Sequence, residues 1–173
     1  LFPKAGYFYV KRAYAPVLAS FKGEVDGVSL WITNDTLEDL VDTVTVFHGD
    51  FSGRKLYEEI LEVRVPANVS LKVKHLPFDE LNTEDPRQEY LAVCSQSGRF
   101  YGNRHFFVEV KDLVRPKPNL KVEINERDDG TYEASPRGRG SARRVRVATD
   151  TYAYFVKLVV PVEGTRFSDN YFD

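Results

Sequence analysis

The stretch GVSLWITN, residues 27–34, decides the fold class of this chain. Apolar and polar side chains alternate along it, with Val28, Leu30 and Ile32 set against Ser29, Trp31 and Thr33. Because successive side chains of a strand point to opposite faces, the alternation predicts a β-strand with one buried face. The same period of two recurs in TVTVFHG, residues 43–49, and predicts a second strand of this kind.

Two further stretches predict β-hairpins. In LEVRVPANVSLKVKHL, residues 61–76, two alternating runs flank a Pro66-Ala67-Asn68 turn. The inward face predicted for this hairpin consists of Leu61, Val63, Val65, Leu71, Val73 and His75. EYLAVCSQ, residues 89–96, and NRHFFVEV, residues 103–110, would pair across a turn at Ser97-Gly98.

With PVLASF at residues 16–21, the part of the chain before residue 111 has six or seven short strands separated by turn residues. Such spacing is typical of an immunoglobulin-like β-sandwich, and the fold class is predicted to be all-β. The chain has a single cysteine, Cys94, so it lacks the disulfide of antibody domains.

A domain boundary is predicted in KDLVRPKPN, residues 111–119, because two prolines stiffen the chain and stop strand pairing. Beyond it, LKVEINE (120–126), RVRVATD (144–150) and YAYFVKLVVP (152–161) read as strands. These strands are too few to close a sandwich, so residues 114–173 are predicted to be a second, truncated immunoglobulin-like sandwich after a first one at 16–113.

Residues 1–15 form a different pattern and predict a short N-terminal helix. Tyr7, Val10 and Tyr14 recur at helical spacing, and Pro16 ends the pattern. This aromatic stripe needs a partner, either an upstream neighbour or the chain's own sandwich. Tyr171 and Phe172 at the other end are large aromatic residues where polar ones are usual. Both ends are therefore expected to be cuts inside a larger folded protein.

Two carboxylate motifs are candidates for catalytic groups. Asn125-Glu126 resembles the dipeptide that carries the acid/base glutamate of many retaining glycosidases, but it precedes a predicted Asp128-Asp129-Gly130 turn. It is interpreted as a solvated turn. Glu58 and Glu59 are neighbours on a predicted strand and point to opposite faces, so they are interpreted as surface charges. No catalytic residue is expected in this chain.

Metal binding is not expected either. His48, His75, His105 and Cys94 are the only soft ligands, and no two of them fall at the spacing of a metal motif. No phosphate-binding loop or dinucleotide fingerprint is present, so no cofactor is predicted.

Three surface features keep alternatives open. The arginine-rich stretch ASPRGRGSARR, residues 134–144, could contact RNA, but it is interpreted as a loop that interrupts a hairpin. Trp31 could stack on a sugar ring, or belong to an interface or the core. Asn34 and Asn68 begin N-glycosylation triplets, which often arise by chance.

The formal net charge of −2 gives no general attraction to nucleic acid or to an anionic membrane. No apolar run approaches the roughly 20 residues that span a bilayer. Neither nucleic acid nor membrane is expected as a partner, and the single cysteine favours a cytoplasmic location.

Several blocks in order resemble a known family. YFYVKRAYAPVLASF, VSLWITND, LEVRVPANVSLKV, RHFFVEVKDL, ATDTYAYFVKL and RFSDNYFD look like the C-terminal region of β-mannosidases in glycoside hydrolase family 2. The resemblance runs from Tyr7 to Asp173. It departs from the family pattern in the arginine-rich insert and in ending directly after the DNYFD block.

The resemblance implies a β-mannosidase that removes terminal, non-reducing β-mannose with retention, using two glutamates of a catalytic barrel that is absent here. Residues 1–15 would end the last barrel helix, and 16–113 and 114–173 would be two accessory domains. The barrel of the same parent chain would then be the partner, and the mannoside would be bound by the parent enzyme. The alternative is a free-standing glycan- or protein-binding module.

Overall fold

The computed structural model describes residues 4–126, 143–159, 167 and 170–171 of the chain. The helices are α1 (Ala5–Ala13), α2 (Phe78–Leu81) and the 3₁₀ turn η1 (Val110–Asp112). The strands are β1 (Val17–Gly23), β2 (Gly27–Asn34), β3 (Leu40–Asp50), β4 (Lys55–Val65), β5 (Val69–Pro77), β6 (Glu89–Ser95), β7 (Asn103–Phe106), β8 (Lys121–Glu126) and β9 (Arg143–Ala148). None of the described helices has the length and apolar character to cross a membrane.

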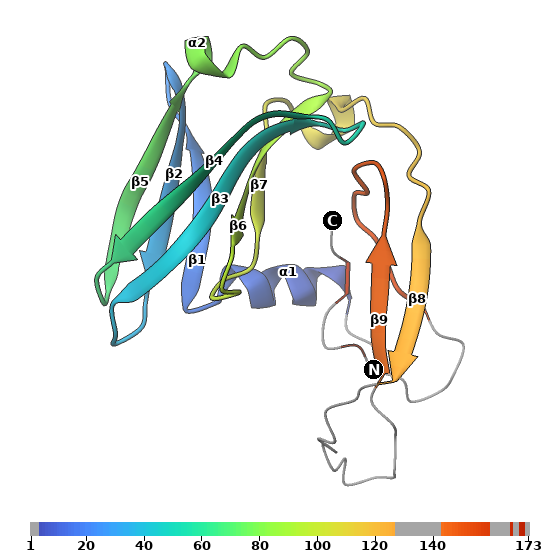
Figure 1. Ribbon diagram of the computed structural model, residues 1–173, viewed down its shortest axis with the longest axis horizontal. Helices are drawn as coiled ribbons and strands as arrows, with labels where there is room; N and C mark the ends of the chain where they lie inside the picture. Colours follow the sequence, from blue (N-terminus) through green and yellow to red (C-terminus); the bar gives the residue numbers. More distant parts are fainter. Residues whose placement is uncertain (1–3, 127–142, 160–166, 168–169, 172–173) are drawn as a thin grey trace, which may run out of the picture.

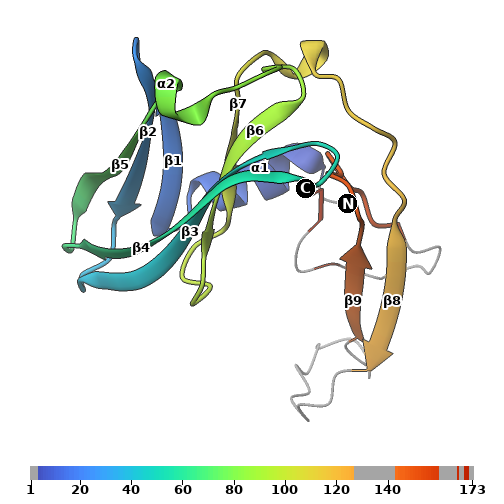
Figure 2. The same ribbon diagram turned by 45° about the horizontal axis from the view of Figure 1, so that its top comes forward.

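Two antiparallel sheets face each other across one core (Figures 1 and 2). The smaller sheet has the order β1-β2-β5, and the larger has the order β4-β3-β6-β7. The predicted alternation is confirmed, since Val28, Leu30 and Ile32 are fully buried. The facing sheet contributes Val44, Val46, Val63, Val65, Leu91 and Val93 to the same core. The predicted immunoglobulin-like sandwich is therefore the observed fold.

The hairpin predicted for residues 61–76 is wrong. β4 pairs with β3, and β5 pairs with β2, so the two runs lie in different sheets. The Pro66-Ala67-Asn68 turn carries the chain across the sandwich, and Asn68 adopts a left-handed backbone with φ of 56°. Both runs have an apolar face to bury, and a sandwich buries those faces against each other better than one flat hairpin would. The hairpin of β6 and β7 is confirmed.

The inward position predicted for His75 is also wrong. The β2–β5 register shifts between Leu30 and Trp31, which pair with Lys74 and Lys72 respectively. This bulge leaves Val73 facing the core and moves His75 to the outer face opposite Ser29.

Asn34, at the end of β2, stabilises the turn between β4 and β5, where the chain passes from one sheet to the other. Its side chain is fully buried, and its Nδ2 donates to the carbonyl oxygens of Glu38, Val65 and Pro66 at 2.9–3.1 Å. Its Oδ1 accepts from the backbone N–H and the hydroxyl of Thr36. The side-chain nitrogen of Asn34, to which a glycan would be attached, is thus buried and hydrogen-bonded, whereas Asn68 is exposed.

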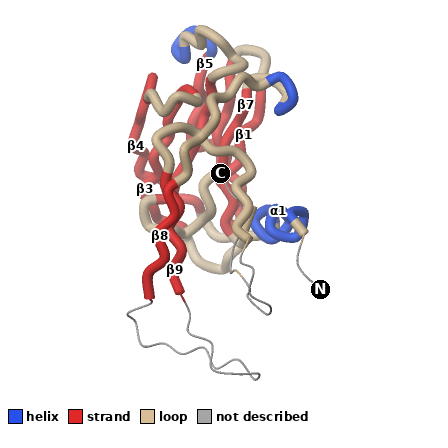
Figure 3. Tube along the Cα trace, turned by 90° about the vertical axis from the view of Figure 1, so that its right-hand side faces the viewer, coloured by secondary structure: helices blue, strands red, loops and turns tan. Residues whose placement is uncertain are grey.

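Beyond residue 114, β8 and β9 pair only with each other among the described residues. Figure 3 shows this ladder in front of the sandwich when the molecule is viewed from that end. Residues 152–159, predicted as a strand, form no strand and only one isolated bridge at Val156. Their aromatic side chains pack instead against the first sandwich and α1. The boundary near residue 114 and the second sandwich stay predictions.

The predicted N-terminal helix is confirmed, but the residue that it buries lies outside the predicted aromatic stripe. Phe8 is buried, and its ring centroid lies 6.1 Å from that of Tyr171 near the end of the chain. The guanidinium of Arg12 donates to the carbonyl oxygens of Asn170 and Tyr171. Tyr7, Val10 and Tyr14 remain 59%, 55% and 85% exposed. Tyr171 therefore packs on α1 and does not enter a strand.

Asn34→Ala is expected to lower the free energy of unfolding by about 2–4 kcal/mol. The substitution leaves the buried carbonyl group of Val65 and the part-buried carbonyl groups of Glu38 and Pro66 without this donor. Urea denaturation of the variant and the parent chain measures the difference. The exposed Asn119 supplies the control substitution, Asn119→Ala, and equal losses in both variants would contradict this role of Asn34.

Candidate functional site

An aromatic cluster joins the sandwich to residues 150–154. Phe51 is 1% exposed, and its ring stacks on Tyr90 with a centroid separation of 5.4 Å and an interplanar angle of 5°. Tyr152 contacts both rings, at 5.1 Å from Phe51 and 4.6 Å from Tyr90. The backbone N–H of Tyr152 also donates to the carbonyl of Phe51 at 3.1 Å. We call the packing of Phe51, Tyr90 and Tyr152 the aromatic seam.

Two arginines lie beside the ring of Tyr154, two residues after Tyr152 of the seam. The guanidinium of Arg115 lies 4.6 Å from the ring centroid of Tyr154, and that of Arg104 lies 5.5 Å from the same ring. Cations near an aromatic face are attracted by its quadrupole. Tyr154 is thereby held between the linker that follows η1 and strand β7.

Gly53 in the β3–β4 turn allows this close approach. Its φ of +96° favours glycine, and a Cβ atom there would lie 2.6 Å from the carbonyl oxygen of Asp150. A side chain at this position would push residues 150–152 off the turn.

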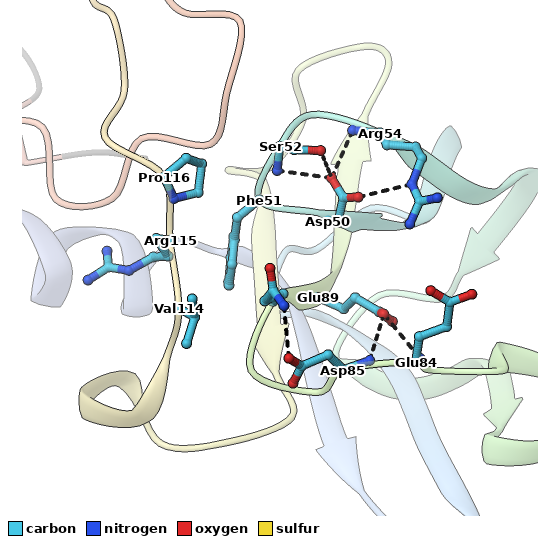
Figure 4. A pocket seen from close by; sticks show the side chains of 11 residues that line it. Asp50, Phe51, Ser52, Arg54, Glu84, Asp85, Glu89, Val114, Arg115 and Pro116 are labelled. Atoms are coloured by element: carbon cyan, nitrogen blue, oxygen red, sulfur yellow. Dashed lines mark hydrogen bonds and ion pairs between the residues drawn. The ribbon is translucent and has the colours of Figure 1, made fainter.

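A polar hollow of about 380 Å³ lies beside the seam (Figure 4). It is lined by Asp50, Phe51, Ser52, Arg54, Glu84, Asp85, Gln88, Glu89, Val114, Arg115 and Pro116. In Figure 4 the linker residues Val114 and Pro116 form one wall, and the side chain of Arg115 points away from the hollow. The carboxylates of Asp50, Asp85 and Glu89 come from the opposite side.

The first of these carboxylates, Asp50, closes the β3–β4 turn. Its Oδ1 accepts from the N–H and hydroxyl of Ser52 and from the N–H of Arg54, and its Oδ2 accepts from Arg54 Nε at 3.0 Å. Partial burial by itself would raise the pKa of Asp50, but these hydrogen bonds outweigh it and hold the pKa below its ordinary value.

Asp85 closes the next loop in a similar way. It accepts from the side chain and the backbone N–H of Arg87 and from the side chain of Gln88. The side-chain hydrogen bond from Arg87 is the largest cause that lowers the pKa of Asp85. Asp85 therefore stays ionised at neutral pH and cannot serve as a proton donor there.

Glu89 lies deepest and contacts a buried histidine. Its Oε2 is 2.8 Å from Nε2 of His48, and the side chains of His48 and Glu89 are 0% and 4% exposed. Its Oε1 accepts from the backbone N–H groups of Glu84 and Asp85 at 3.1 and 3.0 Å. The pair thus fastens the loop before β6 to strand β3.

A sequence signal for this pair exists, although sequence reasoning missed the pair. His48 follows Val44 and Val46 at the strand period, and Glu89 precedes Leu91 and Val93 in the same way. All four apolar residues are fully buried. A titratable residue on the core face of a strand needs a buried partner, and the β3–β6 register brings these two together near the end of the ladder.

Three of the four carboxylates that line the hollow, those of Asp50, Asp85 and Glu89, hold turns and loops in place. Each already accepts hydrogen bonds from neighbouring backbone or side-chain groups, and Asp50 and Asp85 are held in their ionised form. A retaining glycosidase needs a second carboxyl group with a raised pKa about 5 Å from its nucleophile. The arrangement of these carboxylates suits a rigid joint between two parts of the chain.

The structure separates the residues singled out in the sequence. Trp31 is half-buried on the outer face of β2, where it pairs with Ser20 and Lys72. Glu58 and Glu59 lie on the surface of β4, where their carboxylates pair with Lys55 and Lys74, respectively.

Asn125 and Glu126 end β8 opposite Arg144 and Arg143, in a two-stranded ladder. Most of the arginine-rich stretch 134–144 lies outside the described residues.

The four soft ligands lie apart. His48 is in the core, His75 is on the outer face of the smaller sheet, and Cys94 is exposed on β6. His105 on β7 has its ring centroid 6.1 Å from that of Phe21, and burial lowers the pKa of its imidazole. His75 does meet two carboxylates, Glu24 and Asp26, that the spacing of soft ligands did not suggest.

Residues 26–112 match the family described as the mannosidase Ig/CBM-like domain. Among solved structures, the β-D-mannosidase of Dictyoglomus thermophilum is similar, with a TM-score of 0.80 and 20% sequence identity. The similarity covers 98% of this chain and 19% of that chain, so the chain spans about a fifth of that enzyme's length. No curated protein matches the sequence.

Glu89→Ala is expected to lower the free energy of unfolding by about 3 kcal/mol, since it leaves the backbone N–H groups of Glu84 and Asp85 without their acceptor and removes the carboxylate that packs beside the buried His48. Glu84→Ala changes an exposed carboxylate of the same hollow and is the control. Thermal unfolding followed by circular dichroism measures both. If Glu89→Ala melts no earlier than Glu84→Ala, the buried contact contributes nothing to stability.

The stability of the chain is expected to fall as the pH drops below about 4. Asp50 has a lower pKa in the folded chain than its unfolded value of about 3.9, so its contribution is present above that value and is lost in acid. Urea midpoints between pH 3 and 7 measure the slope. Asp50→Asn should give a shallower slope than the parent chain, and identical slopes would refute the assignment.

Proposed function

The chain belongs to the mannosidase Ig/CBM-like domain family, and we propose that it is the accessory, structural region of a β-mannosidase. In this proposal the parent enzyme hydrolyses terminal, non-reducing β-D-mannose residues with retention. The catalytic glutamates belong to a barrel domain of the same parent chain, and this region carries none of the chemistry. A cytoplasmic location is part of the proposal.

The extent of the structural similarity is the observation that carries this proposal. The family match covers residues 26–112, which is the sandwich without β1, whereas the similarity to the solved β-D-mannosidase extends over 98% of the chain. It therefore takes in α1 and the segments after residue 112. A module that acted through its sandwich would not need those flanking parts in the same arrangement.

The aromatic seam supports a structural role. Phe51, Tyr90 and Tyr152 bury large rings against one another, and aromatic pairs of this kind add to the stability that area alone provides. A seam of this kind favours a fixed orientation between the sandwich and the residues that follow it. Such a fixed joint suits a region that positions a neighbouring domain.

The exposed stripe of α1 supplies a surface for that neighbour. Tyr7, Val10 and Tyr14 lie on one side of the helix and are more than half exposed. Large apolar side chains gathered on one helix face indicate a contact with another protein surface. The catalytic barrel of the parent chain is the partner we propose for it.

Glycan binding is the second candidate, because Trp31 lies half-buried on the outer face of a sheet. An indole ring flanked by polar groups such as Ser20 and Lys72 can hold a sugar by stacking and hydrogen bonds. This function predicts that the isolated chain binds a manno-oligosaccharide and that Trp31→Ala abolishes the binding.

Immunodepletion tests the main proposal. An antibody raised against this chain is used to clear a native lysate of its source, and release of p-nitrophenol from p-nitrophenyl β-mannoside is then assayed. Activity is expected to leave the lysate together with an antigen far heavier than 19.8 kDa. A lysate treated with pre-immune serum is the control and should keep its activity.

Two outcomes would contradict the proposal. Activity that stays in solution while the antigen is removed would separate this chain from any β-mannosidase. An antigen near 20 kDa would show a free-standing module, and the glycan-binding candidate would then be tested with Trp31→Ala.

A further inference from the structure

We propose that Glu24, Asp26 and His75 form a binding site for a first-row divalent cation such as Zn²⁺ on the outer face of the smaller sheet. One ligand atom from each residue can be chosen so that all three lie within 4.8 Å of one another. The site shares no residue with the polar hollow or the aromatic seam, and it does not depend on the proposed function.

The β1–β2 turn presents the two carboxylates side by side. β1 ends at Gly23 and β2 begins at Gly27, and the N–H of Glu24 donates to the carbonyl of Gly27 at 2.8 Å. Glu24 and Asp26 therefore flank the tip of a tight turn whose middle residue, Val25, is fully exposed.

This turn is fastened to β5, which carries the histidine. The carbonyl of Asp26 accepts from the N–H of Phe78 at 3.0 Å. A Cβ atom at Gly27 would lie 2.3 Å from the carbonyl oxygen of Leu76, so only glycine lets the two strands approach this closely. The backbones that carry the three candidate ligands are thus held in a fixed relation.

The orientation of His75 suits metal binding through Nε2. Its Nδ1 lies 3.0 Å from the hydroxyl oxygen of Ser29, which is fully buried directly opposite on β2. Histidine ligands commonly use one ring nitrogen for such a hydrogen bond, which fixes the ring and leaves the other nitrogen free for the metal. The β-bulge that turned His75 outward creates this pairing.

The distances favour a shared cation over a direct hydrogen bond. His75 Nε2 lies 3.5 Å from Asp26 Oδ2, beyond the usual range of about 2.7–3.2 Å for a hydrogen bond. Glu24 Oε2 lies 3.6 Å from the other ring nitrogen, Nδ1, so Glu24 would turn its flexible side chain toward a cation bound at Nε2. Two ligand atoms that are each about 2.1 Å from a tetrahedral Zn²⁺ lie about 3.4 Å apart, close to the separation of Nε2 and Oδ2.

The charge around the site is also suitable. Hydrogen bonding to Ser29 is the largest cause that lowers the pKa of Glu24, with Lys72 contributing, so this carboxylate is ionised at neutral pH. Lys72 Nζ lies 3.4 Å from Glu24 Oε1, and its side chain is 42% exposed. A cation would displace the Lys72 ammonium group, which can turn toward solvent on its flexible stem. An imidazole with two carboxylates favours a transition-metal ion over Mg²⁺ or Ca²⁺.

Isothermal titration of the tag-free, EDTA-treated 173-residue chain with ZnCl₂ tests the proposal. We expect one Zn²⁺ per chain, and no heat from MgCl₂ at the same concentrations. His75→Asn and Asp26→Asn should each weaken the affinity at least tenfold. Asp35→Asn changes an exposed aspartate at the other end of β2 and should leave the affinity unchanged. Ser29→Ala should weaken it less than His75→Asn, as expected for a residue that orients a ligand.

A second readout separates loss of the site from loss of the fold. Zn²⁺ should shift the side-chain ¹⁵N resonance of His75 Nε2, and circular dichroism should show unchanged melting of the variants without metal. Absence of binding up to millimolar Zn²⁺ would overturn the proposal and show an ion-pair network only. Binding that survives both His75→Asn and Asp26→Asn would overturn it as well, because the cation would then lie elsewhere.

Discussion

The packing of one apolar face of β2 against the larger sheet is the interaction on which the rest of the structure depends. Val28, Leu30 and Ile32 are fully buried, and they can be so only if a second sheet covers them. At roughly 25 cal/mol for each Å² of apolar surface removed from water, this burial dominates the stabilising terms. It also requires the chain to change sheets between β4 and β5. In the turn between these strands, the side chain of Asn34 donates hydrogen bonds to the backbone carbonyl groups of Val65 and Pro66.

Buried polar residues lie at the two ends of the core face of β3. Asp42 lies near one end of β3, where its carboxylate accepts from the Ser95 hydroxyl at 2.5 Å, and His48 lies near the other end beside Glu89. Apolar residues fill the positions between them. Placing each buried polar group at an end lets a loop or neighbouring strand supply its partner, so that the middle of the core remains apolar. The Glu89 end then becomes the floor of the polar hollow.

At this end of the sandwich, the aromatic seam packs residues 150–154 against the sandwich and so joins the two parts of the chain. The turn after β3 and the linker after η1, which are distant in the sequence, meet at the hollow beside Phe51 (Figure 4), and Tyr152 packs on Phe51 and Tyr90. A joint held by aromatic packing resists bending more than a flexible linker would. This rigidity agrees with a region whose contribution is to position a neighbouring domain.

The sequence by itself determined the strand character, the inward faces of β2 and β3, the β6–β7 hairpin and the short N-terminal helix. These depend on local periodicity, which a linear sequence displays directly. Only the tertiary structure decided that residues 61–76 divide between two sheets and that a bulge turns His75 outward. It also decided that Glu24 and Asp26 meet that histidine and that His48 meets Glu89. Strand partners and register depend on contacts between residues far apart in the chain, and their energies appear only once both sheets are packed.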